Sequence, residues 1–140
     1  CNFTVEALEE LYAETGVRPV INQVETHPYF PQSELRAYEA QHGILHESWS
    51  PLGQGGDLLT DPVLVKIAEK HSASVAQVVI AWHLALGNVV IPKSVTESRI
   101  IENFASLELT LDDEDLAEIN SRDRGAEGRI AADPATADFA

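Results

Sequence analysis

Apolar and polar residues follow one another along this chain in blocks, and each block predicts one helix or one short strand. Apolar positions three or four residues apart predict a helix that begins after Thr4 and ends at Gly16, and a second helix from Ser33 to Gly43. Short, mostly apolar runs predict strands at 19–25, 44–50 and 88–93. Two prolines within 27–31 predict an irregular loop between the first strand and the second helix.

Four more helices are predicted from the residues that can start them. The start signals are Asp61 followed by a proline, Ser74 with a glutamine three positions on, Thr96, and Thr110 with an aspartate three positions on. From residue 124 the chain turns to glycine, alanine, aspartate and proline, which predicts a loop or a loosely docked extension.

Strands that alternate with helices predict right-handed βαβ units and a parallel sheet. We interpret the three strands as nearly wholly apolar, which is typical of strands covered on both faces. Three strands do not close a barrel. A (β/α)₈ barrel has eight strands and typically needs about 250 residues. The 140 residues therefore predict an α/β fold that corresponds to the back half of such a barrel.

Composition narrows the partners of this fold. The net charge of -14 argues against nucleic acid and against anionic membrane surfaces, both of which demand a basic face. A single cysteine cannot form an internal disulfide, and the start shows no secretory signal, so we expect a cytoplasmic location. The chain contains no methionine and opens on Cys1, so we expect it to begin inside a longer protein.

The segment that follows the third strand carries the clearest candidate chemistry. Pro92 ends the strand, Lys93 and a serine come next, and Arg99 lies one turn into the helix that Thr96 begins. An ammonium group, a hydroxyl, free helix N–H groups and a guanidinium suit a phosphate. The alternative is that both cations are solvated residues around an ordinary helix start.

Several motifs, in this order, resemble the aldo-keto reductases, and among them most closely the bacterial 2,5-diketo-D-gluconate reductase group. They are Asn2-Phe3, Asn22-Gln23-Val24-Glu25, His27-Pro28-Tyr29, Trp49-Ser50-Pro51-Leu52-Gly53, and Ile91-Pro92-Lys93-Ser94 with Arg99 and Asn103. The resemblance implies that residues 1–123 form the C-terminal half of the barrel, a (β/α)₈ TIM barrel, and that residues 124–140 form its C-terminal tail. It also implies reduction of aldehydes or ketones to alcohols with NADPH.

The resemblance further implies a cofactor-binding role for thirteen residues. Asn2 and Gln23 would bind the nicotinamide carboxamide, and Trp49 would stack on the nicotinamide ring. Ser50, Leu52 and Gln54 would lie along the pyrophosphate and its ribose. Lys93, Ser94, Val95, Thr96 and Arg99 would grip the adenosine 2′-phosphate, and Glu102 and Asn103 would contact the adenine.

No catalytic residue is assigned, because the family's tyrosine, lysine, aspartate and histidine belong to the front half and none of the chain's three tyrosines matches their motifs. The resemblance then implies that this chain alone is inactive and that its partners are a small carbonyl substrate and the N-terminal half of the barrel or a second copy. The five histidines form no evident metal set.

Alternatives remain open from the residues themselves. Gln23 could be a satisfied polar group inside a barrel, Trp49 a core aromatic, and Asn2 a helix cap. The chain as a whole could be a non-catalytic half-barrel, or a cofactor-sensing or interaction module, since fold does not fix function.

Overall fold

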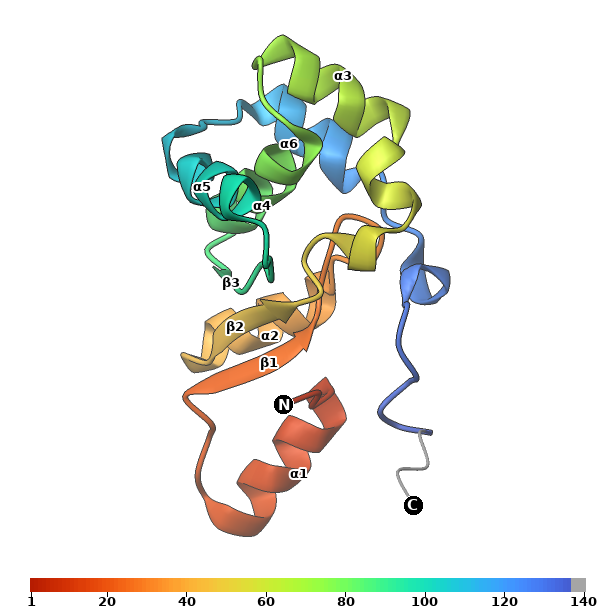
Figure 1. The fold of residues 1–140 in the computed structure, drawn as a ribbon. Helices are drawn as coiled ribbons and strands as arrows, with labels where there is room; N and C mark the ends of the chain where they lie inside the picture. Colours follow the sequence, from red (N-terminus) through yellow and green to blue (C-terminus); the bar gives the residue numbers. More distant parts are fainter. Residues whose placement is uncertain (137–140) are drawn as a thin grey trace.

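Three short parallel strands with helices packed against them form the fold, as the alternating pattern predicted. The computed structural model describes residues 1–136. The helices and strands are α1 (Val5–Thr15), β1 (Ile21–Glu25), α2 (Ser33–His42), β2 (Leu45–Trp49), α3 (Pro62–Lys70), α4 (Val75–Ala85), β3 (Val89–Val90), α5 (Glu97–Ala105) and α6 (Asp113–Asn120). The sheet order is β1-β2-β3, and both pairs of strands are parallel (Figure 1). β3 spans two residues, fewer than the predicted 88–93.

Most helix boundaries follow from local capping. The Thr4 hydroxyl accepts the Ala7 N–H, and Gly16 ends α1 with φ of 68°, a left-handed conformation that glycine adopts without strain. Ser74 and Gln77 form the predicted capping box at the start of α4.

The predicted start of α6 at Thr110 is wrong. Asp112 is the N-cap, and its carboxylate and that of Asp115 each accept the other residue's backbone N–H, at 2.9 and 3.2 Å. This reciprocal pair satisfies two free backbone N–H donors at once. With Thr110 as the N-cap, the first residue of the helix would instead be Leu111, which is buried in the core.

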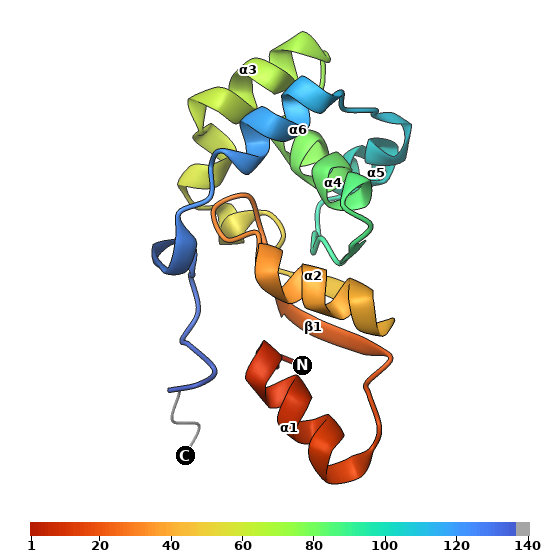
Figure 2. The same cartoon turned by 180° about the vertical axis from the view of Figure 1, so that it is seen from behind.

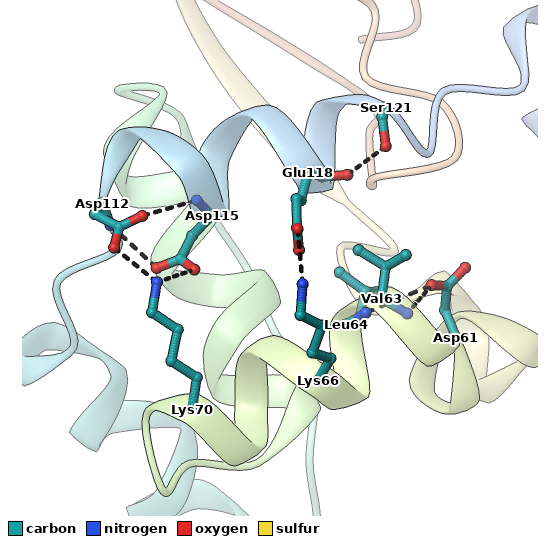
Figure 3. Close-up of polar contacts among 9 residues, drawn as sticks. All are labelled: Asp61, Val63, Leu64, Lys66, Lys70, Asp112, Asp115, Glu118 and Ser121. Carbon is teal, nitrogen blue, oxygen red and sulfur yellow. Dashed lines mark hydrogen bonds and ion pairs between the residues drawn. The ribbon is translucent and has the colours of Figure 1, made fainter.

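The larger core lies among α3, α4 and α6, where Leu64 and Ile67 of α3 and Val78 of α4 are buried. Trp82 and Ile119 have no exposed surface, and the Trp82 indole N–H donates to Asn120 Oδ1 at 2.9 Å. Figure 3 shows the ion pairs that join α3 to α6, from Lys66 to Glu118 and from Lys70 to the two aspartates of the α6 capping box.

A smaller core of Leu8, Val24, Leu35 and Ile44 lies between the sheet and helices α1 and α2 (Figure 2). The opposite face of the sheet is open: Ile21, Leu45 and Val89 are 40%, 51% and 38% exposed. The prediction that the strands are apolar and covered on both faces is therefore wrong for this chain. β1 and β2 also carry the polar side chains Asn22, Gln23, Glu25, His46, Glu47 and Ser48.

The tail is more firmly docked than its composition predicted. The N–H groups of Ile130 and Ala131 donate to the buried Glu25 carboxylate at 2.6 and 2.9 Å, and the Arg124 guanidinium lies 3.3 Å from the ring centre of Tyr29. A Cβ at Gly128 would lie 1.9 Å from the Tyr29 carbonyl oxygen, so this approach requires glycine. The last four residues of the predicted tail, 137–140, lie outside the described residues. No helix within residues 1–136 has the length and apolar character needed to cross a membrane.

Candidate cofactor-binding site

The loop that follows β2 forms one wall of the candidate site. It turns sharply, because Ser50 and Gln54 have φ of 49° and 54°, values that cost a residue with a side chain some strain. Gly53 N–H donates to the Ser50 carbonyl at 3.0 Å, and Gln54 Nε2 donates to Ser50 Oγ at 3.1 Å. Ser50 directly follows Trp49, the last residue of β2.

The segment after β3 forms the facing wall. The Ser94 hydroxyl accepts the Thr96 N–H at 3.1 Å, and α5 begins at the next residue. Thr96 occupies the N-cap position as predicted, but its side chain makes no capping hydrogen bond. A ligand with acceptor oxygens could therefore satisfy the N–H groups of the first turn of α5.

Between the two walls lies a cavity of about 880 Å³. Ten of the thirteen residues predicted to hold the cofactor line it: Ser50, Leu52, Gln54, Lys93, Ser94, Val95, Thr96, Arg99, Glu102 and Asn103. Asn2, Gln23 and Trp49 do not. The cavity is also lined by three motif residues that had been given no cofactor-binding role, Pro51, Ile91 and Pro92, and by five residues outside the motifs, Gly55, Leu59, Ser74, Val75 and Ala76. The start of α4 had a clear signal in Ser74, but no local pattern indicates that this helix start borders the cavity.

The start of α4 holds one lining residue in place. Ser74 Oγ donates to Glu102 Oε1, and Gln77 Nε2 donates to the Glu102 carbonyl at 3.2 Å. The capping box therefore also ties α4 to α5. The predicted contact of Glu102 with an adenine stays a prediction, and one carboxylate oxygen already has a protein partner.

The cavity gathers the two basic side chains that have no partner among residues 1–136. Within residues 1–136, no hydrogen bond or ion pair engages the side chain of Lys93 or Arg99, and both are exposed. The other seven cations pair with acids, carbonyl oxygens or aromatic rings, as the Lys66 and Arg122 ion pairs illustrate. In a chain of net charge -14, this is a local concentration of positive potential.

The remaining three predicted residues form a separate cluster on the open face of the sheet. The Asn2 N–H donates to the Gln23 carbonyl at 2.8 Å, and the Trp49 indole N–H donates to Asn2 Oδ1 at 2.8 Å. Gln23 Nε2 donates to Glu47 Oε1 on the neighbouring strand. Trp49 is half-buried and belongs to neither core, and α1 is capped by Thr4 rather than by Asn2.

Tyr29 and Tyr38 are poorly suited to donate a proton. Burial, with a hydrogen bond and charge repulsion from Asp61, raises the pKa of Tyr29 to about 12. Partial burial and the hydrogen bond to Glu9 raise the pKa of Tyr38. Tyr12 lies 4.0 Å below the Arg18 guanidinium. A tyrosine that acts as a general acid needs its pKa lowered towards the working pH, so the two shifts have the wrong sign for that chemistry.

The buried histidines join the sheet to its surroundings. His46 contacts Glu39 at 2.5 Å and Thr26 at 2.7 Å, and His27 contacts Glu25 at 3.0 Å. Among the described residues, no group of three or more His, Cys, Asp and Glu side chains is placed to hold a metal ion.

Comparison with known proteins matches the family model described as "Aldo/keto reductase family" to residues 1–124. The chain is 50% identical over 135 residues to methylglyoxal reductase DkgA of Salmonella typhimurium, which covers 96% of this chain and 48% of that protein. It is 49% identical over 138 residues to an aldo-keto reductase of Mycolicibacterium smegmatis, a match that covers 99% of this chain and 49% of that protein. The chain thus spans about half the length of the curated relatives it matches.

Two crystal structures of Gox0644 share the fold, one of the apo form and one of a mutant in complex with NADPH. Each has a TM-score of 0.94 and 50% sequence identity, and each comparison covers 99% of this chain and 50% of that chain. The three parallel strands and their helices therefore correspond to half of an aldo-keto reductase barrel, as predicted.

Proposed function

Because this chain belongs to the aldo/keto reductase family, we propose that it forms the cofactor-binding half of an NADPH-dependent oxidoreductase that reduces aldehydes or ketones to alcohols. The observation that carries the proposal is the cavity after β2 and β3, which is lined by ten of the thirteen residues that the resemblance implied for the cofactor. Its volume lies within the roughly 300–1,000 Å³ of ordinary ligand sites. The cavity also lies at the carboxyl ends of parallel strands, where barrels of this kind bind their ligands.

The phosphorylated end of the cofactor would bind between Lys93, Arg99 and the first turn of α5. Each of the three favours negative charge: an ammonium, a forked guanidinium and the positive end of a helix. The absence of protein partners for the two cations within residues 1–136 means that binding a phosphate breaks no ion pair. Glu102 and Asn103 would border the adenine, with Glu102 held by Ser74.

The nicotinamide end would lie on the open face of the sheet. The half-buried Trp49 offers its ring for stacking, and the amides of Asn2 and Gln23 suit a carboxamide because amides donate and accept at once. The bound cofactor supplies a hydride. The residues of this chain bind and orient it.

We propose that residues 1–123 form this half-barrel, that 124–140 form its C-terminal tail, and that proton donation to the carbonyl comes from residues outside the 140. The raised pKa values of Tyr29 and Tyr38 support this division, because a general acid needs a lowered pKa. The chain alone would then not turn over, and its partner would be the other half of a barrel. The name methylglyoxal reductase, borne by a relative, supports a small carbonyl substrate. The single cysteine fits the reducing cytoplasm.

Replacement of one cation tests the proposal. In Arg99→Ala, the dissociation constant for NADPH is expected to rise about tenfold to a hundredfold, because a hydrogen bond to a charged group contributes roughly 1.5–3 kcal/mol. The dissociation constant for NADH, which has no 2′-phosphate, is expected to change less than twofold. Isothermal titration calorimetry measures both.

Lys66→Ala is the matched control, because Lys66 is an exposed cation on α3 that pairs with Glu118 and does not line the cavity. It is expected to change neither constant. Equal losses for NADPH and NADH in Arg99→Ala would show that Arg99 does not contact the 2′-phosphate. No binding of NADPH by the wild-type chain would overturn the proposed function.

A further inference from the structure

A carboxylate accompanies the nicotinamide cluster, and neither the motifs nor the cavity includes it. Glu47 on β2 pairs in register with Gln23 on β1, so the two side chains lie on the same open face of the sheet. Gln23 Nε2 donates to Glu47 Oε1. Within the described residues Glu47 has no cationic partner, so this amide is the group that satisfies the carboxylate.

The chemistry of the pair fixes which end of the Gln23 amide is free. An ionised carboxylate only accepts hydrogen bonds, so the atom of Gln23 that contacts it must be the NH₂ nitrogen. The Gln23 Oε1 atom then points away from Glu47 as an acceptor.

The second amide of the cluster is fixed in the opposite sense. The Trp49 indole N–H only donates, so it binds the oxygen of Asn2 and leaves the Asn2 NH₂ group as a donor. A φ of 59° at Asn2, which asparagine tolerates better than most residues, belongs to the same arrangement. The cluster therefore presents the NH₂ group of Asn2 as a donor and the Oε1 atom of Gln23 as an acceptor. These complement the carbonyl oxygen and the NH₂ group of a primary carboxamide.

We propose that Glu47 is a positioning residue that fixes the polarity of the Gln23 amide, so that the site selects a carboxamide and rejects the corresponding carboxylic acid. The inference rests on the proposed function, since it assigns the carboxamide to the nicotinamide of the cofactor. It adds a specificity-determining residue that acts through Gln23. A carboxylate ligand would face the Gln23 oxygen, with no hydrogen between the two acceptors.

Three probes separate this inference from the proposed function. NADP⁺ carries the carboxamide, nicotinic acid adenine dinucleotide phosphate carries a carboxylate in its place, and 2′,5′-ADP carries only the phosphorylated adenosine end. Calorimetry on the wild-type chain is expected to show that it prefers NADP⁺ over the nicotinic acid form by about a hundredfold, and that it also binds 2′,5′-ADP.

In Glu47→Gln the preference for NADP⁺ is expected to fall about tenfold. The new amide can donate to Gln23 Oε1, which lets Gln23 turn its NH₂ group towards the ligand carboxylate. The substitution preserves shape, and an unchanged affinity for 2′,5′-ADP shows that the cavity is intact. Glu14→Gln, at an exposed position on α1, is the matched control and is expected to leave all three affinities unchanged.

A second substitution tests whether Glu47 acts through Gln23. In the Gln23→Leu background, Glu47→Gln is expected to leave the remaining preference unchanged, since the coupled partner is gone. A shift that persists there would mean that the Glu47 charge acts on the ligand directly, and would overturn the inference. So would an unchanged preference in Glu47→Gln when 2′,5′-ADP still binds. Failure of the wild-type chain to bind 2′,5′-ADP would overturn the proposed function itself.

Discussion

His83 links the interior of the protein to the wall of the cofactor cavity. It is fully buried in α4, its Nε2 lies 3.4 Å from the Pro51 carbonyl oxygen, and Asn88 Nδ2 lies 3.3 Å from its Nδ1. The Asn88 NH₂ group only donates, so Nδ1 accepts and Nε2 carries the proton that it donates to Pro51. The ring is therefore neutral. Burial lowers its pKa to about 3, although the Pro51 contact acts in the other direction.

This lowered pKa predicts a loss of stability in mild acid. Between pH 6.5 and 3 the unfolded chain binds a proton at His83 that the folded chain does not, so the free energy of unfolding falls as the pH falls. The slope reaches about 1.4 kcal/mol per pH unit. From pH 7 to 5, wild type is expected to lose about 2 kcal/mol more than His83→Gln, measured by urea unfolding.

His42→Gln is the control, because His42 is half-buried at the end of α2 and, within the described part of the chain, its side chain hydrogen-bonds only to the Tyr38 carbonyl. It is expected to keep the wild-type pH profile. A His83→Gln profile parallel to that of wild type would show that His83 binds its proton equally well in the folded and the unfolded chain, and would contradict the lowered pKa.

At this scale, the sequence predicts a residue when its signal is local. Lys93 and Arg99 were predicted to belong to one site because both follow a strand end and flank a helix start within seven residues, and both line the same cavity. The Gln23–Glu47 pair could not be predicted in the same way, because 24 positions separate the two residues and only the register of β1 against β2 brings them together.

At the scale of elements, α6 has two candidate N-cap residues, Thr110 and Asp112, and the structure uses the second. Asp112→Ala is expected to lower the free energy of unfolding by about 1 kcal/mol, the usual effect of removing an N-cap side chain. Thr110→Ala is expected to change it by less than about 0.5 kcal/mol, as for an exposed residue outside any cap. Urea unfolding of the two variants decides between the starts, and a larger effect at Thr110 would place the start of α6 at the earlier position.

The elements were predictable where one signal dominated. Helices α1, α3 and α4 each begin at the residue that follows the predicted N-cap, because a capping side chain and an apolar face agree in each of them. β3 was predicted too long because Ile91 and Pro92 continue the apolar run, although only Val89 and Val90 pair with residues of β2. The length of a strand depends on how many of its residues pair with the neighbouring strand, and the sequence of the strand alone does not carry this information.

At the scale of the whole molecule, exposed apolar side chains on two faces have no partner within the described residues. α5 has no buried residue, and its side chains Ile101 and Phe104 are 64% and 74% exposed. The open face of the sheet adds Ile21, Leu45 and Val89. Exposed apolar side chains on these two faces favour association, and the outer edges of β1 and β3 add backbone groups that have no partner strand within the described residues. In the proposed complete barrel, the other half covers both.

In isolation, this surface is expected to make the chain associate with itself despite its net charge of -14. Sedimentation velocity at tens of micromolar should therefore detect dimers or larger species in addition to the monomer. Phe104→Glu is expected to weaken association at least about tenfold, because burial of one phenylalanine contributes roughly 1.5–3 kcal/mol. Val17→Glu adds the same charge at an exposed apolar residue outside α5 and the sheet, and should have little effect. A monomer at every concentration would show that these exposed faces are tolerated in water and that the half-barrel needs no partner.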